Sequence, residues 1–387
     1  MRKEKIYSLS SLYRENMDIY GYRFGKGEKA ACIVGAMRGN EIQQMYIGAL
    51  LVKSLKELEE RGSIVNGNEI LVIPHVNDYS INIGKRFWPG DNTDINRMFP
   101  GNEEGETTKR IAAGLFEKVK GYSYGIQFPS FYMPGDFVPH VRMMEAGMES
   151  ASLANLFGLP YVVMRSPRPY DKATLNYNWQ QWNTHAFSIY TGACDQVDES
   201  SAKQAVSAVL RFLTRMGILR YTSHSGYIAS VVVEQDLTSV CSDNAGIYRR
   251  YFKPGDEVKR GEVLADVISP DDGSVISQIH SPTEGTIFFA CGQPLIMEGT
   301  LLYSDLHGNP VSLDSNHRVT HYSCMEEEDC FYGFGEKAGP LNKNKMFLRE
   351  RATDAMGYDA EKTDTLYKHI PFYIRLNRSS KKAVGVF

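Results

Sequence analysis

Residues 29–46 read KAACIVGAMRGNEIQQMY and join a strand pattern to a helix pattern through a short turn. The apolar run at residues 30–34 is typical of a buried strand, and the turn at residues 38–40 contains glycine and asparagine. A helical pattern begins at Glu41. In an open α/β sheet, ligands bind outside the carboxyl ends of the strands. The side chains of this turn are therefore candidates for a binding site.

The stretch that follows completes a unit of strand, helix and strand. Apolar residues recur at spacings of three and four between Ile42 and Leu55, which predicts an amphipathic helix packed on a sheet. The sequence EILVIP at residues 69–74 has the composition of a buried strand. Two such strands joined by a helix predict a right-handed parallel crossover. The amino-terminal part of the chain is therefore expected to be an α/β domain.

The 387-residue chain is expected to hold three parts. Strand and helix patterns alternate over residues 1–220. Short β-rich runs separated by turns such as KPGD (253–256) and KRGE (259–262) predict an all-β module at residues 221–303. Residues 304–387 differ again in composition and are expected to form a β-rich tail. Exposed strand edges in that tail would allow homo-oligomers to form.

The charge and the apolar pattern exclude some classes of partner. Lysine and arginine total 43 against 46 acidic residues, so nothing draws the whole molecule to nucleic acid or to an anionic membrane. The amino terminus lacks the apolar segment of a signal peptide, and no stretch approaches the roughly 20 apolar residues of a membrane span. We therefore expect a cytoplasmic protein. The six cysteines include no C-x-x-C pair, which fits reduced thiols better than disulfides or a structural zinc site.

A long polar and aromatic loop is expected at residues 75–101. Long ordered loops inside compact domains usually carry function. The second half of this loop, residues 86–101, reads RFWPGDNTDINRMFPG. Its polar side chains are candidates for binding a ligand. An alternative role for Asp91, Asp94 and Asn96 is to hold the loop together through hydrogen bonds to its own backbone.

The order of these motifs over residues 30–300 resembles that of the succinylglutamate desuccinylase and aspartoacylase family. GAMRGNE at residues 35–41 lies where that family has a His-Gly-Asn-Glu sequence, and residues 86–101 match its Arg, Pro-x-Asp and Asp-Leu-Asn-Arg-x-Phe-Pro-Gly run. PHVR at residues 139–142 and the hairpin sequence KPGDEVKRGEVL at residues 253–264 agree with this resemblance. It implies a zinc-carboxypeptidase-like mixed sheet with flanking helices, followed by an all-β barrel-sandwich module that also resembles a lipoyl domain.

The resemblance also implies that the zinc site is degenerate. Active relatives bind zinc through a His and a Glu of the first motif and a second His on a later strand, and another Glu acts as general base. Here Arg38 stands at the first His position, whereas Glu41 is kept. The segment from Gln127 to Pro129 replaces the second His, and Tyr190 stands at the general-base position. Since a guanidinium cannot ligate a metal, no cofactor is expected, and Arg38 is expected to pair with Glu41.

The residues that bind substrate in the relatives are kept. Those matching Arg86, Asn96 and Arg97 grip the carboxylate and carbonyl groups of the substrate, and Arg142 of the PHVR motif joins them as a candidate. Four further residues are expected to line the pocket: Arg38, Glu41, Gln127 and Tyr190. The leading interpretation is a protein that has lost zinc-dependent amide hydrolysis and binds a carboxylate-bearing molecule, either a small acid or an N-acylated compound.

A second interpretation keeps the enzyme active. It would be a metal-dependent acyl-amide hydrolase or carboxypeptidase that holds zinc through a non-standard ligand set. The candidate ligands are three histidines expected near the pocket edge, together with Glu41 or Asp136: His75, His140 and His185. None of these histidines has the His-x-x-x-His spacing of a zinc helix, so a structural role for each is the alternative.

The tail resembles the amino-terminal β-sandwich of family 31 glycoside hydrolases, the α-glucosidase group. The matching motifs are YGFGEK at residues 332–337 and DTLYKHIPF at residues 364–372. In those enzymes the catalytic carboxylates lie on a later barrel, which the chain does not reach. We therefore expect no glycosidase activity from this polypeptide and a fused or truncated fragment at residues 304–387. A third interpretation is a carbohydrate-associated protein that acts through this tail.

Overall fold

The computed structural model describes most of the chain. The described residues are 1–12, 15–146, 151–222, 224, 226–307, 329–335, 341–343, 369–378 and 382–386. The chain divides into two compact units, Met1–His321 and Tyr322–Phe387. Each unit is considered by itself.

Within the described part of the first unit, nine strands form one mixed sheet in the order β1-β2-β4-β3-β5-β9-β7-β8-β10. Its central strands β4, β3, β5 and β9 run parallel, and β7 runs antiparallel to β9. The strands are β1 (Arg2–Leu9), β2 (Met17–Gly25), β3 (Gly27–Ala36), β4 (Gly67–His75), β5 (Tyr124–Gln127), β7 (His140–Met144), β8 (Tyr161–Arg165), β9 (His185–Tyr190) and β10 (Ser230–Val233). The carboxyl ends of β3, β5 and β9 therefore meet at one edge of the sheet.

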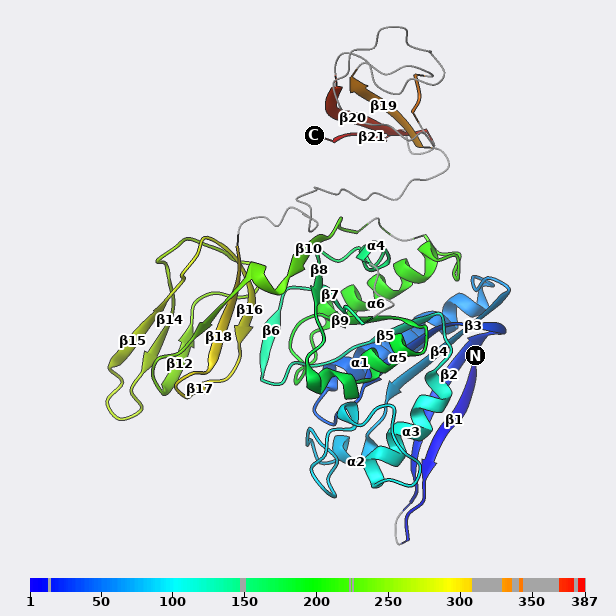
Figure 1. Ribbon diagram of the computed structural model, residues 1–387, viewed down its shortest axis with the longest axis horizontal. Helices are drawn as coiled ribbons and strands as arrows, with labels where there is room; N and C mark the ends of the chain where they lie inside the picture. The colour runs from blue at the N-terminus through cyan, green and yellow to red at the C-terminus, as the bar shows by residue number, and fades with distance from the viewer. Residues whose placement is uncertain are drawn as a thin grey trace. The chain divides into compact units, whose positions relative to one another are not determined.

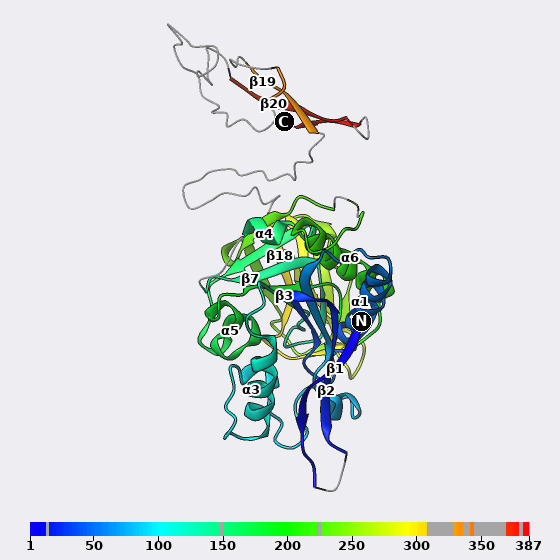
Figure 2. The same cartoon turned by 90° about the vertical axis from the view of Figure 1, so that its right-hand side faces the viewer.

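Helices cover both faces of this sheet, as Figures 1 and 2 show. On one face, Leu51 of α1 and Phe212 of α6 belong to one buried apolar cluster. On the other face, Leu115 of α3 and Trp179 of α5 belong to a second cluster. The helices are α1 (Ile42–Glu60), α2 (Asp78–Ile81), α3 (Thr107–Val119), α4 (Ala151–Asn155), α5 (Leu175–Gln181) and α6 (Glu199–Arg215), and the 3₁₀ turns are η1 (Ile95–Arg97), η2 (Pro169–Ala173) and η3 (Glu234–Asp236).

The crossover predicted from residues 29–74 is confirmed. Strands β3 and β4 are parallel neighbours, with Val34 opposite Ile73, and α1 connects them. Gly48 allows the helix to lie close to the sheet, because a Cβ atom there would be 2.8 Å from the Cα atom of Pro74. The turn that carries Arg38 follows β3 directly, so its side chains lie at the carboxyl end of a central strand.

The all-β module forms two antiparallel sheets around a core that includes Leu264, Phe288 and Tyr303. One sheet has the order β11-β18-β16-β13, with β6 also paired to β16, and the other has the order β15-β14-β12-β17. The strands are β6 (Gly135–Phe137), β11 (Leu237–Cys241), β12 (Gly246–Arg250), β13 (Glu257–Val258), β14 (Val263–Ile268), β15 (Val275–His280), β16 (Gly285–Cys291), β17 (Leu295–Ile296) and β18 (Leu301–His307).

The α/β domain and the module exchange strands across the boundary expected at residue 220. Strand β6 comes from the α/β domain and pairs with β16, with Phe137 opposite Phe289. Strand β10 lies beyond that boundary and extends the large sheet by pairing with β8. The module therefore holds the segment just before β7 in place, and β7 carries Arg142.

The described part of the second unit is a three-stranded antiparallel sheet, β19 (Asp329–Gly335), β20 (His369–Asn377) and β21 (Lys382–Val386). Tyr373 of β20 contacts the rings of Phe331 and Phe334 of β19. Most of the DTLYKHIPF motif and the end of the YGFGEK motif lie outside the described residues. Homo-oligomers through the edges of this sheet remain a prediction.

Two predictions from composition concern the whole described part of the chain. No helix there combines the length and the apolar character that crossing a membrane requires. Five cysteines are free thiols, Cys32, Cys194, Cys241, Cys291 and Cys330, whereas Cys324 lies outside the described residues.

Candidate functional site

Arg38 and Glu41 form a buried ion pair at the turn between β3 and α1, as the sequence predicts. The Nη1 atom of Arg38 lies 2.8 Å from Oε1 of Glu41, and the two side chains are 4% and 0% exposed. Asp94 of the long loop contacts the other side of the guanidinium, 2.9 Å from Nη2. Burial acts to lower the pKa of Arg38, but the two carboxylates outweigh it and raise that pKa. Arg38 is therefore a fixed cation.

Both carboxylate oxygens of Glu41 are occupied by hydrogen-bond donors. Oε2 accepts from the backbone N–H groups of Met37 and Arg38 at 2.8 and 3.0 Å. Oε1 accepts from Arg38 and from both the backbone N–H and the hydroxyl of Ser130. The Ser130 hydroxyl in turn accepts from Nη1 of Arg86 at 3.1 Å. Glu41 therefore has no oxygen turned away from this network toward a metal.

Arg86 lies behind this network and is not among the cavity-lining residues. Burial, together with the nearby Arg38 cation, lowers the pKa of Arg86. The backbone of the loop also holds the turn, because the carbonyl of Arg86 accepts from the N–H of Gly39 at 3.2 Å. A Cβ atom at Gly39 would be 2.3 Å from the carbonyl oxygen of Lys85, so only glycine allows this close approach. The expected role of Arg86 in substrate binding remains a prediction.

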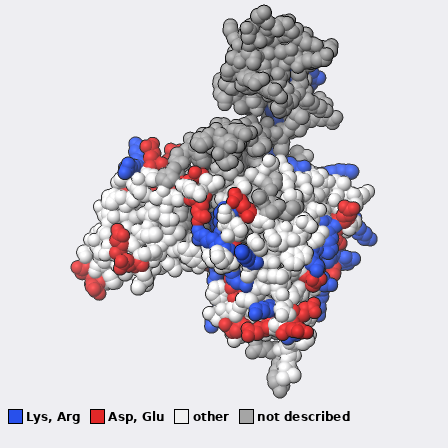
Figure 3. Space-filling model, viewed as in Figure 1, with Lys and Arg blue, Asp and Glu red and all other residues white. Residues whose placement is uncertain are grey.

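A cavity of about 70 Å³ opens beside Arg38, with room for a few water molecules or a small anionic group. Its lining is rich in arginine, amide and hydroxyl groups, and it includes six of the eight residues expected in the site. The lining residues are Arg38, Asn96, Arg97, Gln127, Pro129, Ser130, Arg142, Met143, Met144, Arg165, Asp171, Thr174, Asn176, Ser188 and Tyr190. Figure 3 shows lysine and arginine side chains gathered near the middle of the face seen there, next to acidic ones.

Asn96 and Arg97 reach the cavity from the 3₁₀ turn η1. The Asp94 carboxylate accepts from the backbone N–H of Asn96, which starts this turn. The Asn96 side-chain oxygen accepts from Gln127 at 3.4 Å. Arg97 lies with its Nη1 atom 3.6 Å from Oδ1 of Asp171, and its guanidinium stacks on the ring of Tyr170. Asp94 therefore holds the loop through a hydrogen bond to its backbone, the alternative role given above, and it also forms an ion pair with Arg38.

Arg142 lies against Tyr190, the residue at the expected general-base position. Its guanidinium carbon is 4.4 Å from the centre of the Tyr190 ring, a cation–π contact. The ring of His140 is parallel to that of Tyr190, with the centroids 4.9 Å apart. Nδ1 of His140 is 2.8 Å from the carbonyl of Val138, and Nε2 is 3.3 Å from Nη2 of Arg142. His140 thus donates to the carbonyl and accepts from Arg142.

Burial and the Arg142 cation hold the pKa of His140 well below its ordinary value, so the imidazole is neutral at pH 7. Its Nε2 atom accepts a hydrogen bond from Arg142. The other two histidines do not converge on the cavity. His75 contacts Asp78 at 2.5 Å, and His185 lies at the start of β9, whereas Tyr190 lies at its end. Asp136 contacts Arg250 on the module.

The donor set does not fit zinc. Within the described ranges, no three His, Cys, Asp or Glu side chains lie together as a group that could hold a metal ion. The guanidinium of Arg38 has no lone pair to donate and repels a dication. The hydrogen bonds that Glu41 accepts occupy both of its oxygens. No reaction step through a bound metal follows from these residues.

Residues 28–216 match the catalytic domain of the succinylglutamate desuccinylase/aspartoacylase family. This part of the chain is thus similar to a succinylglutamate desuccinylase/aspartoacylase catalytic domain. Hereafter it is called the AspA-like domain.

Solved structures show that the fold extends beyond the AspA-like domain. A succinylglutamate desuccinylase from Silicibacter sp. TM1040 is 19% identical, with a TM-score of 0.65 over 79% of this chain and 93% of its own. A desuccinylase/aspartoacylase from Rhodobacter sphaeroides is 18% identical, with a TM-score of 0.64 over 79% and 95%. The ectoine utilization protein EutE from Ruegeria pomeroyi is 19% identical, with a TM-score of 0.63 over 76% and 90%. The predicted fold class is confirmed.

The carboxyl-terminal part has a different relative, again as predicted. Residues 266–387 match the amino-terminal galactose mutarotase-like domain of family 31 glycosyl hydrolases. The match begins inside β14, earlier than the boundary expected at residue 304. A curated α-glucosidase 2 from Bacillus thermoamyloliquefaciens is 24% identical over 183 residues, which are 44% of this chain. The aligned part spans only 23% of that enzyme.

Several cavity residues were missed by sequence reasoning, among them Ser130, Arg165 and Asp171. Arg165 ends β8, and Asp171 lies in the η2 turn that follows it. The run RSPRPYD from Arg165 to Asp171 directly follows a predicted strand, and its charge and prolines were the available signal. Ser130 follows the segment that replaces the second His of the family.

Proposed function

We propose that the AspA-like domain binds a small carboxylate-bearing molecule in the arginine-lined cavity and does not hydrolyse amides through zinc. The observation that carries this proposal is the buried ion pair between Arg38 and Glu41. By the sequence resemblance, these two residues stand where active relatives have a His and a Glu that bind zinc. A positive side chain and a dication repel each other, and removing either ion-pair partner would leave a buried charge. The domain is therefore organised around a fixed salt bridge.

The charge of the cavity supports an anionic ligand. Four of the described lining residues are arginines, and Asp171 is the single carboxylate among them. Arginine offers paired N–H donors that match the two oxygens of a carboxylate. The amides of Asn96, Gln127 and Asn176 can accept or donate to a neighbouring carbonyl or N–H group of the ligand. An N-acylated or otherwise acidic small molecule has these groups.

Calorimetry together with an activity assay tests the proposal. The full chain is titrated with a panel of small carboxylic acids and N-acyl amino acids, with and without excess chelator. Release of free amine is followed in parallel with added Zn²⁺, Mn²⁺ or Co²⁺. We expect binding heat that the chelator does not change, and no release of amine. Chelator-sensitive turnover of any substrate, or the absence of binding to every acid, would contradict the proposal.

A second candidate function rests on the match of residues 266–387 to a glycosyl hydrolase domain. We propose that this part of the chain associates with carbohydrate. Titration of the full chain with maltose and with methyl α-glucoside is expected to give saturable heat that an Arg142→Met substitution in the cavity leaves unchanged. A flat titration would exclude this function.

A further inference from the structure

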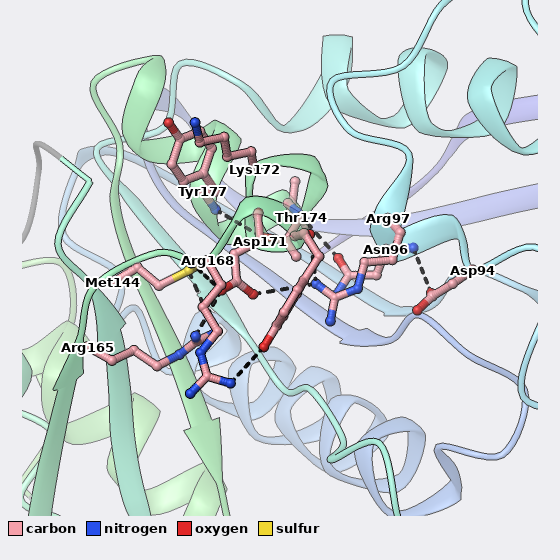
Figure 4. Close-up of polar contacts among 12 residues, drawn as sticks. Asp94, Asn96, Arg97, Met144, Arg165, Arg168, Asp171, Lys172, Thr174 and Tyr177 are labelled. Carbon is pink, nitrogen blue, oxygen red and sulfur yellow. Dashed lines mark hydrogen bonds and ion pairs between the residues drawn. The ribbon is translucent and has the colours of Figure 1, made fainter. Parts of the chain in front are cut away.

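Asp171 lies between two of the cavity arginines. Its Oδ2 atom is 2.8 Å from Nη1 of Arg165, and its Oδ1 atom is 3.6 Å from Nη1 of Arg97. The side chain is buried, 3% exposed, and also accepts from the backbone N–H of Arg168, which fixes the η2 turn. Figure 4 shows Arg165 and Arg97 approaching Asp171 from opposite sides. Asp171 is therefore an ion-pair partner of both Arg165 and Arg97.

Arg142 has a different environment. Among the described residues, no carboxylate lies within ion-pair distance of its guanidinium, so Asp171 acts on it only at longer range. Its buried Nε atom has no hydrogen-bond partner, which is also true of Nε of Arg165. The Tyr190 ring and the neutral His140 hold it in position. Neither group cancels its charge. A buried N–H group without a partner is costly, so an anion that accepts from it gains binding free energy.

The charges around the cavity divide into two groups. Arg38 and Arg86 lie with Glu41 and Asp94, so this first group is balanced. The second group contains three arginines and one aspartate, which leaves an excess of two positive charges: Arg97, Arg142, Arg165 and Asp171. In the second group only Arg142 is without a carboxylate contact in the described structure.

We propose that Asp171 determines which anions the cavity accepts, by engaging Arg97 and Arg165 and leaving Arg142 to receive the anionic group of the ligand. This inference rests on the proposed function and names the residue that sets its specificity. The first carboxylate of a ligand binds Arg142. A second negative charge brought close to it meets the Asp171 carboxylate, and like charges in contact oppose binding. The cavity therefore discriminates against compact dianions.

Acetate and malonate are suitable probes because both are small, and malonate adds a second carboxylate close to the first. Each acid is titrated by calorimetry into the full chain at pH 7.5 and constant ionic strength. The variants are Asp171→Asn, Arg142→Met, Arg142→Lys and Arg97→Met. The Asp171→Asn variant keeps a side-chain oxygen for the N–H of Arg168 while it removes the charge.

We expect Asp171→Asn to raise the affinity ratio of malonate to acetate at least fivefold. Arg142→Met should weaken both acids at least tenfold, with partial recovery in Arg142→Lys, whereas Arg97→Met should cost less than threefold. An unchanged or lower ratio in Asp171→Asn, or an equal loss in Arg97→Met and Arg142→Met, would overturn the inference. The two arginine variants test the same assignment if Asp171→Asn does not fold. Binding of no acid by the wild type would instead refute the proposed function itself.

Discussion

Oε1 of Glu41 lies 2.8 Å from Nη1 of Arg38, and a second carboxylate, that of Asp94, lies 2.9 Å from Nη2 of the same guanidinium. The cation at the centre of the AspA-like domain is thus bound on two sides. Because these groups are buried, each charge depends on the others to compensate its lost hydration. This network of charges ties the turn after β3 to the long loop.

Removal of the central cation should destabilise the domain. Arg38→Met leaves Glu41 and Asp94 without their common partner, and breaking a buried pair in this way costs about 3–5 kcal/mol. Urea unfolding followed by circular dichroism measures the free energy of unfolding. Lys53→Met, on the exposed side of α1, is the matched control and should change this free energy by less than about 0.5 kcal/mol. Equal effects of the two substitutions would contradict the role given to Arg38.

The stability of the protein should depend on pH through His140. Its pKa is well below 6.5 in the folded chain, so at mildly acidic pH the unfolded chain binds a proton that the folded chain does not. The contribution of neutral His140 to the free energy of unfolding is complete above pH 6.5. It is lost as the pH falls below that value, by at most about 1.4 kcal/mol per pH unit.

His140→Gln removes this titration, so its unfolding free energy should fall less steeply than that of the wild type between pH 6.5 and 5. Urea unfolding at several pH values gives the two slopes. His75→Gln is the control, since His75 is about one-third exposed and lies apart from Arg142. Parallel slopes for the wild type and His140→Gln would show that His140 binds a proton equally well in both states.

Tyr190 should act through its ring and not through its hydroxyl. Its ring supports the Arg142 guanidinium, and a cation–π contact of this kind is worth about 0.5–2 kcal/mol. Tyr190→Phe should therefore keep acetate affinity within about twofold, whereas Tyr190→Leu should lower it by roughly 2- to 30-fold, as that energy range implies. Calorimetric titration measures both. Loss of binding in Tyr190→Phe would assign the role to the hydroxyl.

Local pattern in the sequence was sufficient for part of this structure. The crossover could be predicted from β3, α1 and β4, because the spacing of apolar residues in each segment indicates a strand or a helix. Arg38 and Glu41 are three residues apart, so their pairing follows from local geometry. The family motif at residues 86–101 also identified the loop that carries Asp94, Asn96 and Arg97.

Contacts between distant segments could not be predicted in this way. Asp94 reaches Arg38 across 56 residues, and Asp171 reaches Arg97 across 74, so only the tertiary fold brings them together. The exchange of β6 and β10 between the α/β domain and the module likewise depends on sheet pairing. His140 had the residue type of a metal ligand, and the neighbouring Arg142 gives it a different role.

Metal analysis of the purified chain tests the central claim most directly. The protein is incubated with excess ZnCl₂, passed through a desalting column and measured by atomic emission, beside a Glu41→Gln variant treated in the same way. We predict less than about 0.1 zinc ion per chain in both samples, because the Arg38 cation contacts Glu41 and both Glu41 oxygens accept hydrogen bonds. One zinc ion per wild-type chain, absent from Glu41→Gln, would contradict this account.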